Sequence, residues 1–260
     1  MEDSPENSLD HMAHRPYPLP TRPWRMKQRW NDLLFAHYPI PPSQMAPLIP
    51  TGLELDTFDG QAWLGVVPFW MDQVENRTIG DSTLSIPTTR IFSELNLRTY
   101  VRSPRTGLCG IYFFSLDCSS PLAVIGARTL FHLPYYFADI NRTPSITIPD
   151  QTHYVSRRQL TSSNPRFEAT FRPTGPVTLS TPGSLAAFLT ERYCLFTTFR
   201  NCVLRGDIHH LPWPLQSAEA DIRTDELPQA HNLTLPHDTP PILHFSSSLD
   251  VYIWSLQPDL

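Results

Sequence analysis

Proline is the residue that most restricts what this chain can fold into. The 260 residues contain 28 prolines and only 10 glycines. Proline fixes φ and has no backbone N–H, so it breaks helices and is excluded from the central strands of a sheet. Because the prolines are spread along the chain, long helices are excluded almost everywhere, and short strands joined by turns are favoured.

The composition excludes several classes of protein. Apolar residues make up 40% of the chain and charged residues 17%, which is typical of a globular protein. The net charge is −5 and no basic stripe is present, so we expect no nucleic-acid partner. The longest nearly uninterrupted apolar run, residues 62–71, is too short to cross a bilayer, and the acidic N-terminus has no apolar signal core. We therefore expect a cytoplasmic protein with no membrane contact.

Alternation and turn signals predict a chain made mainly of strands. Residues 94–102 alternate between apolar and polar side chains, as expected of a strand with two different faces. Asp59 and Gly60 separate the apolar runs 53–58 and 62–71, and this pair is a strong hairpin signal. Residues 72–90 carry weak signals and are predicted to form a polar connection. Further strands are predicted over residues 32–40, 110–117, 153–160, 166–172, 177–179, 193–199, 202–209, 216–224, 242–247 and 251–256, and short helices over 41–48, 121–131 and 184–190.

We expect one folded domain preceded by a tail. Residues 1–23 hold few large apolar side chains and several prolines, which favour an extended, disordered chain. No linker-like segment divides residues 24–260. The predicted fold class is therefore mainly β with short helices, in a single domain whose large antiparallel sheet curls or closes into a barrel.

A row of polar side chains in the strand at residues 94–102 is the first candidate site. Glu94, Asn96 and Arg98 share one face, and Leu95 and Leu97 lie on the other. If the polar face contacts solvent, the row is an ordinary wet sheet surface. If the sheet closes, the row lines an interior, where a buried glutamate and a buried arginine each need a partner that a polar ligand could supply. The sequence leaves both alternatives open.

The segment around residues 128–136 is the second candidate. It joins the end of a predicted helix to His132, Tyr135 and Tyr136, and Pro134 can turn one of the tyrosines inward. The alternative is that both tyrosines are core aromatics with their hydroxyl groups at the rim.

No sequence motif indicates a metal or a cofactor. The four cysteines have no C-x-x-C spacing, and no P-loop, G-x-G-x-x-G or G-x-S-x-G occurs. A third candidate segment combines residues 191–193, Glu-Arg-Tyr, with His209 and His210 at the end of a predicted hairpin. Two adjacent histidines on a strand point to opposite faces, so they form no simple chelate. We therefore predict no metal and no cofactor.

Five segments together resemble the YqjF-like family of uncharacterised bacterial proteins. They are LELDTFDG at 53–60, ELNLRTYV at 94–101, IYFFSLD at 111–117, FHLPY at 131–135 and HLPWPLQ at 210–216. The resemblance covers residues 24–256. That family is similar, more distantly, to acetoacetate decarboxylases, which implies a cone-shaped, barrel-like antiparallel sheet enclosing a small pocket.

The resemblance to the decarboxylases also implies positions in that pocket. Glu94 occupies the strand from which a decarboxylase glutamate faces the reacting carbon, and Tyr135 stands where those enzymes carry their Schiff-base lysine. A second acidic position falls at Gly65, and a substrate-binding arginine falls near Arg29. Because a tyrosine forms no iminium with a ketone, and the one lysine of the chain, Lys27, is remote from this position in the sequence, we exclude the Schiff-base mechanism.

Two functions remain open from the sequence. The first is an enzyme that uses acid–base chemistry, by proton transfer, hydration or a lyase reaction, on a small carbonyl or carboxylate compound. The second is a binding module that holds a small molecule without turning it over. A homo-oligomer is also compatible with the resemblance, since related folds often assemble. The predicted catalytic residues are Glu94 and Tyr135, and the predicted substrate-binding residues are Arg98, Asn96, Arg29, His132 and Tyr136.

Overall fold

The computed structural model of the chain describes residues 8–78, 82–85 and 90–260. Strands account for 50% of the residues and helices for 12%, which confirms the predicted mainly β class. The strands are β1 (Met26–Ile40), β2 (Glu54–Leu55), β3 (Ala62–Arg77), β4 (Thr83–Leu84), β5 (Phe92–Arg102), β6 (Cys109–Cys118), β7 (Tyr135–Pro144), β8 (Thr152–Arg158), β9 (Arg166–Pro173), β10 (Cys194–Phe199), β11 (Cys202–His209), β12 (Gln216–Asp225), β13 (Ile242–Ile253) and β14 (Gln257–Pro258). The helices are α1 (Pro42–Met45), α2 (Pro121–Leu130) and α3 (Leu185–Thr190), with short 3-10 turns at Ser8–Asp10, Ala46–Leu48 and Gln229–His231.

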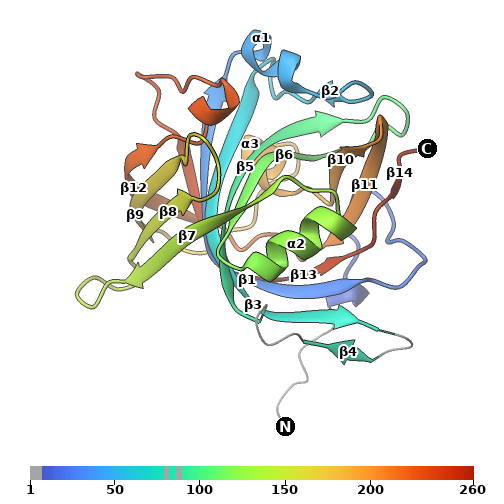
Figure 1. Cartoon of the computed structure of the whole chain (residues 1–260), viewed down its shortest axis with the longest axis horizontal. Helices are drawn as coiled ribbons and strands as arrows, with labels where there is room; N and C mark the ends of the chain where they lie inside the picture. Colours follow the sequence, from blue (N-terminus) through green and yellow to red (C-terminus); the bar gives the residue numbers. More distant parts are fainter. Residues whose placement is uncertain (1–7, 79–81, 86–89) are drawn as a thin grey trace.

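The strands form two closed circuits that share one wall (Figure 1). The first circuit is a closed, nine-stranded mixed barrel in the order β13-β1-β3-β5-β6-β7-β8-β9-β12, in which β12 pairs back onto β13. The second circuit leaves the wall at β6, passes through β10 and β11, and returns to β13. The wall formed by β13, β1, β3, β5 and β6 therefore has one face in each circuit.

Two parallel pairings make the sheet mixed, which corrects the prediction of an antiparallel sheet. β6 runs parallel to β7 and to β10, and the other described pairings are antiparallel. Parallel neighbours need a crossover connection, because a tight turn reverses the chain direction. Helix α2 supplies that crossover between β6 and β7, and it packs against both strands.

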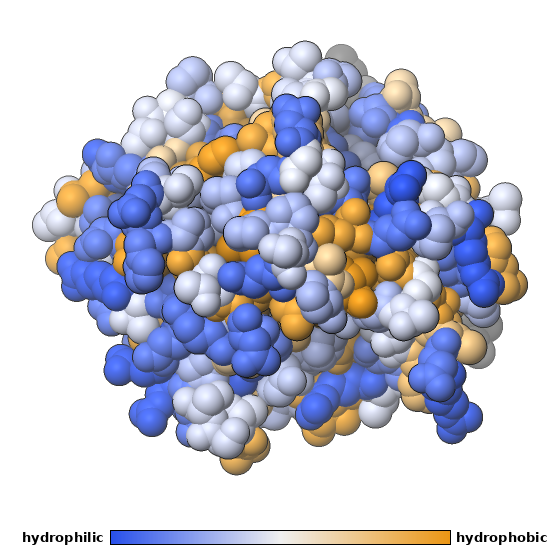
Figure 2. Space-filling view, turned by 90° about the horizontal axis from the view of Figure 1, so that it is seen from above, coloured by the Kyte–Doolittle hydropathy of each residue, from blue (hydrophilic) through white to orange (hydrophobic). Residues whose placement is uncertain are grey.

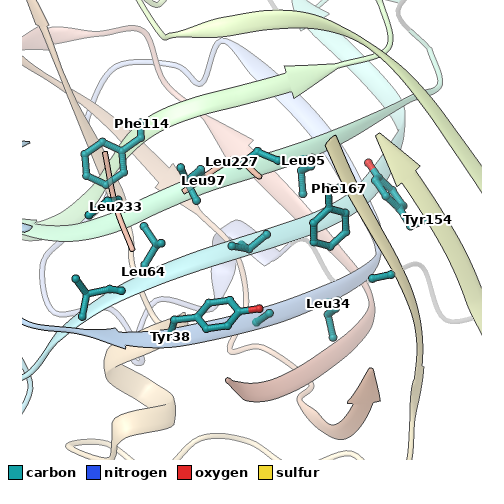
Figure 3. Packing of buried hydrophobic residues seen from close by; sticks show 14 of the residues in the cluster. Leu34, Tyr38, Leu64, Leu95, Leu97, Phe114, Tyr154, Phe167, Leu227 and Leu233 are labelled. Carbon is teal, nitrogen blue, oxygen red and sulfur yellow. The ribbon is translucent and has the colours of Figure 1, made fainter. Parts of the chain in front are cut away.

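A packed hydrophobic cluster fills the nine-stranded barrel. Leu95 and Leu97 on β5 point into it, together with Leu64 on β3 and Leu34 on β1, and all four side chains are fully buried (Figure 3). Burying one such side chain stabilises a fold by about 1.5–3 kcal/mol. This face of the shared wall is therefore packed core, and the side chains that alternate with these leucines face the second circuit.

The short helices begin where the sequence predicts. Ser120 caps α2 by accepting a hydrogen bond from the backbone N–H of Ala123, and Pro121 occupies the first turn, where its missing N–H is harmless. Ser184 caps α3 in the same way, through the N–H of Ala187. Among the residues described by the structure, no helix is long and apolar enough to cross a membrane.

Several element predictions differ from the structure, of which these are the main ones. β3 continues to Arg77 and so includes residues 72–77, which were predicted as a polar connection, because they pair with the first residues of β1. β7 was not predicted, because it mixes aromatic and charged side chains without a clear period. Residues 242–253 form one strand rather than two. Residues 177–179 contribute a single bridge, at Thr178, rather than a strand.

The predicted turn at Asp59 and Gly60 forms, but it does not join a long hairpin. Both residues have positive φ, 50° and 77°, as a tight hairpin turn requires. Phe58 and Gln61 on either side exchange two backbone hydrogen bonds. The strand before the turn, β2, then pairs with β5 instead of β3. Local turn chemistry was therefore predicted correctly, whereas the pairing partner was not.

The N-terminal segment lies against the second circuit. Arg15 is 8% exposed, and its guanidinium donates a hydrogen bond to the Ile208 carbonyl oxygen at 2.7 Å and lies 4.8 Å from the centre of the Tyr193 ring. His14 contacts the His210 carbonyl oxygen at 2.9 Å through Nε2. These contacts of residues 8–23 differ from the disorder expected from their prolines. Residues 1–7 of the expected tail lie outside the described residues.

The surface carries scattered apolar side chains among polar ones. At the end of the molecule that carries α1, polar side chains predominate and apolar ones show between them (Figure 2). Away from that end, Leu122, Ile125 and Leu130 on α2 are each more than half exposed. Exposed apolar residues of this kind are normal when they are scattered.

Candidate active site

A cavity of about 220 Å³ lies inside the second circuit. Its walls come from the shared sheet, from β10 and β11, and from α2. Most of the described lining side chains are apolar. The polar groups include Glu94, Asn96 and Arg98 on β5, together with Arg192 and His210.

The polar row of β5 faces this cavity. Glu94, Asn96 and Arg98 are 2%, 4% and 4% exposed, respectively, and all three line the cavity. Leu95 and Leu97 occupy the barrel core on the opposite face, so the two-residue period of the strand separates the two environments. The alternative left open by the sequence is thereby decided, because the sheet closes on both sides of β5.

Glu94 and Tyr135 meet in the cavity wall. Parallel pairing of β7 with β6 brings Tyr135 opposite Leu116, and its hydroxyl group donates a hydrogen bond to Glu94 Oε2 at 2.9 Å. From the barrel side, the Tyr154 hydroxyl group donates to the Glu94 carbonyl oxygen at 2.9 Å and holds the backbone. The Glu94 side chain is therefore held from β7 and its backbone from β8.

Burial changes the acidity of this pair. Loss of solvent raises the pKa of Glu94 from 4.5 to about 8, although hydrogen bonds from Tyr135 and Asn96 lower it and the nearby charge of Asp117 raises it further. Burial, followed by the charge of Glu94, raises the pKa of Tyr135 well above its ordinary value. Glu94 is therefore mostly protonated at neutral pH and gains or loses its proton near pH 8, while Tyr135 remains a hydrogen-bond donor.

Arg98 is a buried cation without a carboxylate partner among the described residues. Its Nη2 donates to the Leu189 carbonyl oxygen at a long 3.5 Å, and its Nε has no hydrogen-bond partner in the described structure. The guanidinium lies 5.4 Å from the centre of the Phe35 ring. Gly65 sits beside it on β3, where a Cβ atom would lie only 3.2 Å from Arg98 Cγ. A buried charge left in this state favours an anionic ligand.

Arg192 and His210 extend the polar part of the cavity. Arg192 pairs with Asp56 at 2.7 Å, so its charge is already balanced. His210 Nε2 lies 3.2 Å from the Arg192 carbonyl oxygen, and burial lowers the pKa of this histidine to about 4, which keeps it neutral. Both segments were predicted from the sequence as a candidate site separate from Glu94. The residue types at 191–193 and 209–210 made these segments visible as candidates, but only closure of the sheet brings them to the cavity.

Three residues predicted to bind substrate are not among the described lining residues. Arg29 forms an ion pair with Asp250 at 2.7 Å, because the alternation of β1 turns Gln28 and Trp30 toward the cavity instead. Tyr136 follows Tyr135 on β7 and so points to the opposite face, where the Arg158 guanidinium lies 4.0 Å from its ring centre. The His132 ring stacks on Phe199 with 3.9 Å between the ring centres. The structure does not bring these three residues to Glu94.

The positions implied by the decarboxylase resemblance carry no amine in this structure. Lys27 Nζ lies 3.3 Å from Asp250 Oδ2, and Lys27 is not among the described lining residues. Tyr135 and Gly65 stand at the lysine position and at the second acidic position. In the part of the chain that the structure describes, no group of three or more His, Cys, Asp or Glu side chains is arranged to hold a metal ion.

Comparison with known proteins identifies a family to which the chain is similar along most of its length. The sequence pattern of DUF2071, an uncharacterized conserved protein family (COG2071), matches residues 27–250. The uncharacterized protein YqjF of Bacillus subtilis (strain 168) is 45% identical over 239 residues, which cover 92% of this chain and 94% of that protein. These matches confirm the family resemblance stated from the sequence.

Solved structures with low sequence identity share the fold. The enduracididine biosynthesis enzyme MppR complexed with pyruvate superimposes with a TM-score of 0.61 at 12% identity, covering 94% of this chain and 93% of that one. Acetoacetate decarboxylase from Legionella pneumophila superimposes with a TM-score of 0.59 at 14% identity, covering 100% and 98%. At such identities the likeness shows the fold alone, and the acetoacetate decarboxylase-like fold predicted from the sequence is confirmed.

Proposed function

This chain belongs to the DUF2071 family of uncharacterized conserved proteins, and we propose that it is an enzyme that transfers a proton at the carbon next to the carbonyl group of a small oxo acid. The observation that carries this proposal is the buried contact of 2.9 Å between the Tyr135 hydroxyl group and Glu94 in the cavity wall. Enzymes of this fold that have been solved include one complexed with pyruvate, a small 2-oxo acid. A small oxo acid suits this cavity because its carbonyl group can face Glu94 and Tyr135 and its carboxylate can face Arg98.

In the proposed reaction Glu94 is the base and Tyr135 is the hydrogen-bond donor to oxygen. Ionised Glu94 takes the proton from the carbon beside the carbonyl group, and the electron pair of the broken C–H bond passes into an enolate. Once Glu94 has taken the proton, the Tyr135 hydroxyl group turns its one hydrogen from the carboxyl group to the enolate oxygen and donates a hydrogen bond there. Glu94 then returns a proton to the carbon. A pKa of about 8 suits both steps, because it lies close to neutral pH.

Arg98 is the proposed partner of the substrate carboxylate. Its buried guanidinium has an unpartnered Nε and no ion pair among the described residues. A carboxylate accepts two parallel N–H bonds from a guanidinium, and such a bond would balance the charge that the protein leaves unpaired. Asn96 lies between Arg98 and Glu94 on β5 and lines the same cavity.

The proposed chemistry does not pass through a Schiff base. Schiff-base catalysis needs a lysine amine in contact with the carbonyl carbon. Tyr135 stands at the position implied for that lysine, and Lys27 pairs with Asp250 instead of lining the cavity. Stabilisation of the enolate must then come from hydrogen bonding and charge.

Deuterium exchange followed by NMR tests this proposal. Pyruvate or 2-oxobutanoate is incubated in D2O with the full chain, and loss of the proton signal beside the carbonyl group is compared with a protein-free sample. We expect exchange that rises with pH as Glu94 ionises toward pH 8. Glu94→Gln should lower it by roughly 10²–10⁴-fold, and Tyr135→Phe by roughly 10²-fold.

The control is Glu54→Gln, which removes an exposed carboxyl group on β2. Exchange that is unchanged in Glu94→Gln would overturn the proposal. Calorimetry separates the alternative function. If the acids bind, and Arg98→Gln abolishes that binding while exchange stays at the protein-free rate, the cavity is a binding site without catalysis.

A further inference from the structure

We infer that the ligand of this cavity carries an apolar tail, so that its class is oxo acids with an aromatic or medium-length alkyl side chain. This inference rests on the proposed function, because it assigns the acid and carbonyl groups to the same β5 row. It adds what the apolar part of the cavity lining implies for the rest of the ligand.

The cavity lining is polar at the β5 row and mostly apolar around it. Its polar side chains on the shared wall include Glu94, Asn96 and Arg98. The described residues that line it from β6, β10, α2 and the segment after α2 are all apolar: Ile111, Phe113, Leu116, Leu122, Ala123, Gly126, Ala127, Leu130, Phe131, Leu133 and Leu195. The shared wall adds apolar lining residues of its own, including Met71 on β3 and Phe92 on β5, so a ligand that matches the cavity carries a polar group at the β5 row and an apolar body.

The cavity is larger than the polar row requires. Its volume of about 220 Å³ corresponds to roughly seven waters at their liquid share of about 30 Å³ each. An acid that ended at its carbonyl group would leave the apolar side in contact with water alone. Burying a methylene group against such a lining raises affinity about fourfold. The apolar lining therefore favours the binding of a ligand that carries an apolar tail.

Small residues on α2 keep this side open. The residues of α2 that line the cavity are Leu122, Ala123, Gly126, Ala127 and Leu130; the three middle residues are small, and the two leucines are more than half exposed. Gly126 lies inside the helix, where glycine is unfavourable relative to alanine. Apart from its two chain neighbours and the backbone of α2 itself, no described atom lies within 4 Å of the place where its Cβ would be. The missing side chain therefore leaves free space, which the proposed tail fills.

The polar end gives an independent reason for an amphipathic acid. Arg98 is 4% exposed, lines the cavity, and has an Nε without a partner in the described structure. A tail alone would leave this buried cation unbalanced. The ligand must therefore join an anionic head at Arg98 to an apolar body.

Calorimetry with a graded series tests the inference on the full chain. The probes are pyruvate, 2-oxobutanoate, 2-oxohexanoate and phenylpyruvate, which share one head group. We expect affinity to rise about fourfold for each added methylene group. Gly126→Leu should remove most of the gain from the longer tails, and Gly126→Ala should remove part of it. Leucine and alanine both favour a helix over glycine, so both variants should fold.

The matched control is Ile125→Ala, on the outer face of α2, where the side chain is 59% exposed. It should leave the whole series unchanged. If Gly126→Leu fails to fold by circular dichroism, Ala127→Leu tests the same space. The inference would be overturned if all four acids bound with equal affinity. It would also be overturned if the longer acids still bound more tightly than pyruvate in both Gly126→Leu and Ala127→Leu.

The two proposals fail separately. If pyruvate exchanges its protons in a Glu94-dependent way but longer tails do not raise affinity, the proposed function stands and the apolar-tail inference is wrong. If longer tails raise affinity in a Gly126-dependent way but no Glu94-dependent exchange occurs, the inference of an amphipathic ligand stands and the proposed catalysis is wrong. If no acid of the series binds, both are wrong.

Discussion

Glu94 is held in an environment that favours its neutral form. It is 2% exposed, receives a hydrogen bond from Tyr135, and has no ion pair among the described residues. Burial raises its pKa from 4.5 to about 8. A buried carboxyl group that titrates near neutral pH is a common property of catalytic acids and bases, whereas structural carboxylates are usually held ionised by a cation.

This pKa shift predicts a pH-dependent gain of stability in Glu94→Gln. The pKa is higher in the folded state than in the unfolded state, so the folded protein loses stability as pH rises from about 4.5 to about 8. The loss amounts to about 1.4 kcal/mol per pH unit. Glutamine keeps an acceptor for Tyr135 and cannot ionise. In urea titrations, Glu94→Gln should therefore be close to wild type near pH 4.5 and more stable by a few kcal/mol at pH 8.

The exposed Glu54→Gln variant controls for the loss of a carboxyl group as such. Its effect on the free energy of unfolding should be small at both pH values, as is usual for surface substitutions. A difference between Glu94→Gln and wild type that does not change with pH would show that burial does not set the acidity of Glu94.

At the scale of elements, β5 serves two interiors at once. Leu95 and Leu97 belong to the barrel core, and Glu94, Asn96 and Arg98 line the cavity. A slip of one residue in its pairing would exchange these two faces. The packed leucines therefore hold the register that keeps the polar row in the cavity.

Leu97→Ala should consequently destabilise the protein strongly. The side chain is fully buried in the barrel cluster, and truncating such a leucine costs about 2–5 kcal/mol through lost burial and the cavity left behind. Thermal or urea unfolding measures the change. Ile125→Ala on the exposed face of α2 is the control and should stay within about 0.5 kcal/mol of wild type. Equal effects of the two substitutions would contradict the assignment of Leu97 to the core.

At the scale of the whole molecule, the N-terminal segment packs against the second circuit. Arg15 reaches the Ile208 carbonyl oxygen at 2.7 Å and the Tyr193 ring, and His14 contacts the His210 carbonyl oxygen. His210 itself lines the cavity. The segment is therefore packed directly behind the polar end of the site.

Arg15→Ala should lower stability by about 1.5–3 kcal/mol, the usual contribution of a hydrogen bond from a charged group. It should also speed proteolytic cleavage within residues 8–23. Arg105→Ala, which removes an exposed arginine in a turn, is the control and should change neither property. Wild-type stability and wild-type cleavage in Arg15→Ala would mean that the segment is a free tail, as its prolines suggest.

Much of the fold could be predicted because the underlying signals are local. The proline content excluded long helices, and alternation identified the strand with Glu94 and its neighbours on one face. Asp59 and Gly60 form the predicted turn, since their positive φ depends on those two residues alone. β7 was missed and the partner of β2 was wrong, because neither a mixed strand nor a pairing partner leaves a local pattern.

The tertiary structure alone decided what belongs to the candidate site. The sequence determined that Glu94, Asn96 and Arg98 share a face, because side chains alternate along any strand. Only the closure of the sheet through β10 and β11 decided that this face is enclosed, and brought Arg192 and His210 to it. That closure depends on pairings between strands far apart in the chain, and these pairings follow from the packing of the whole molecule rather than from the period of any one segment.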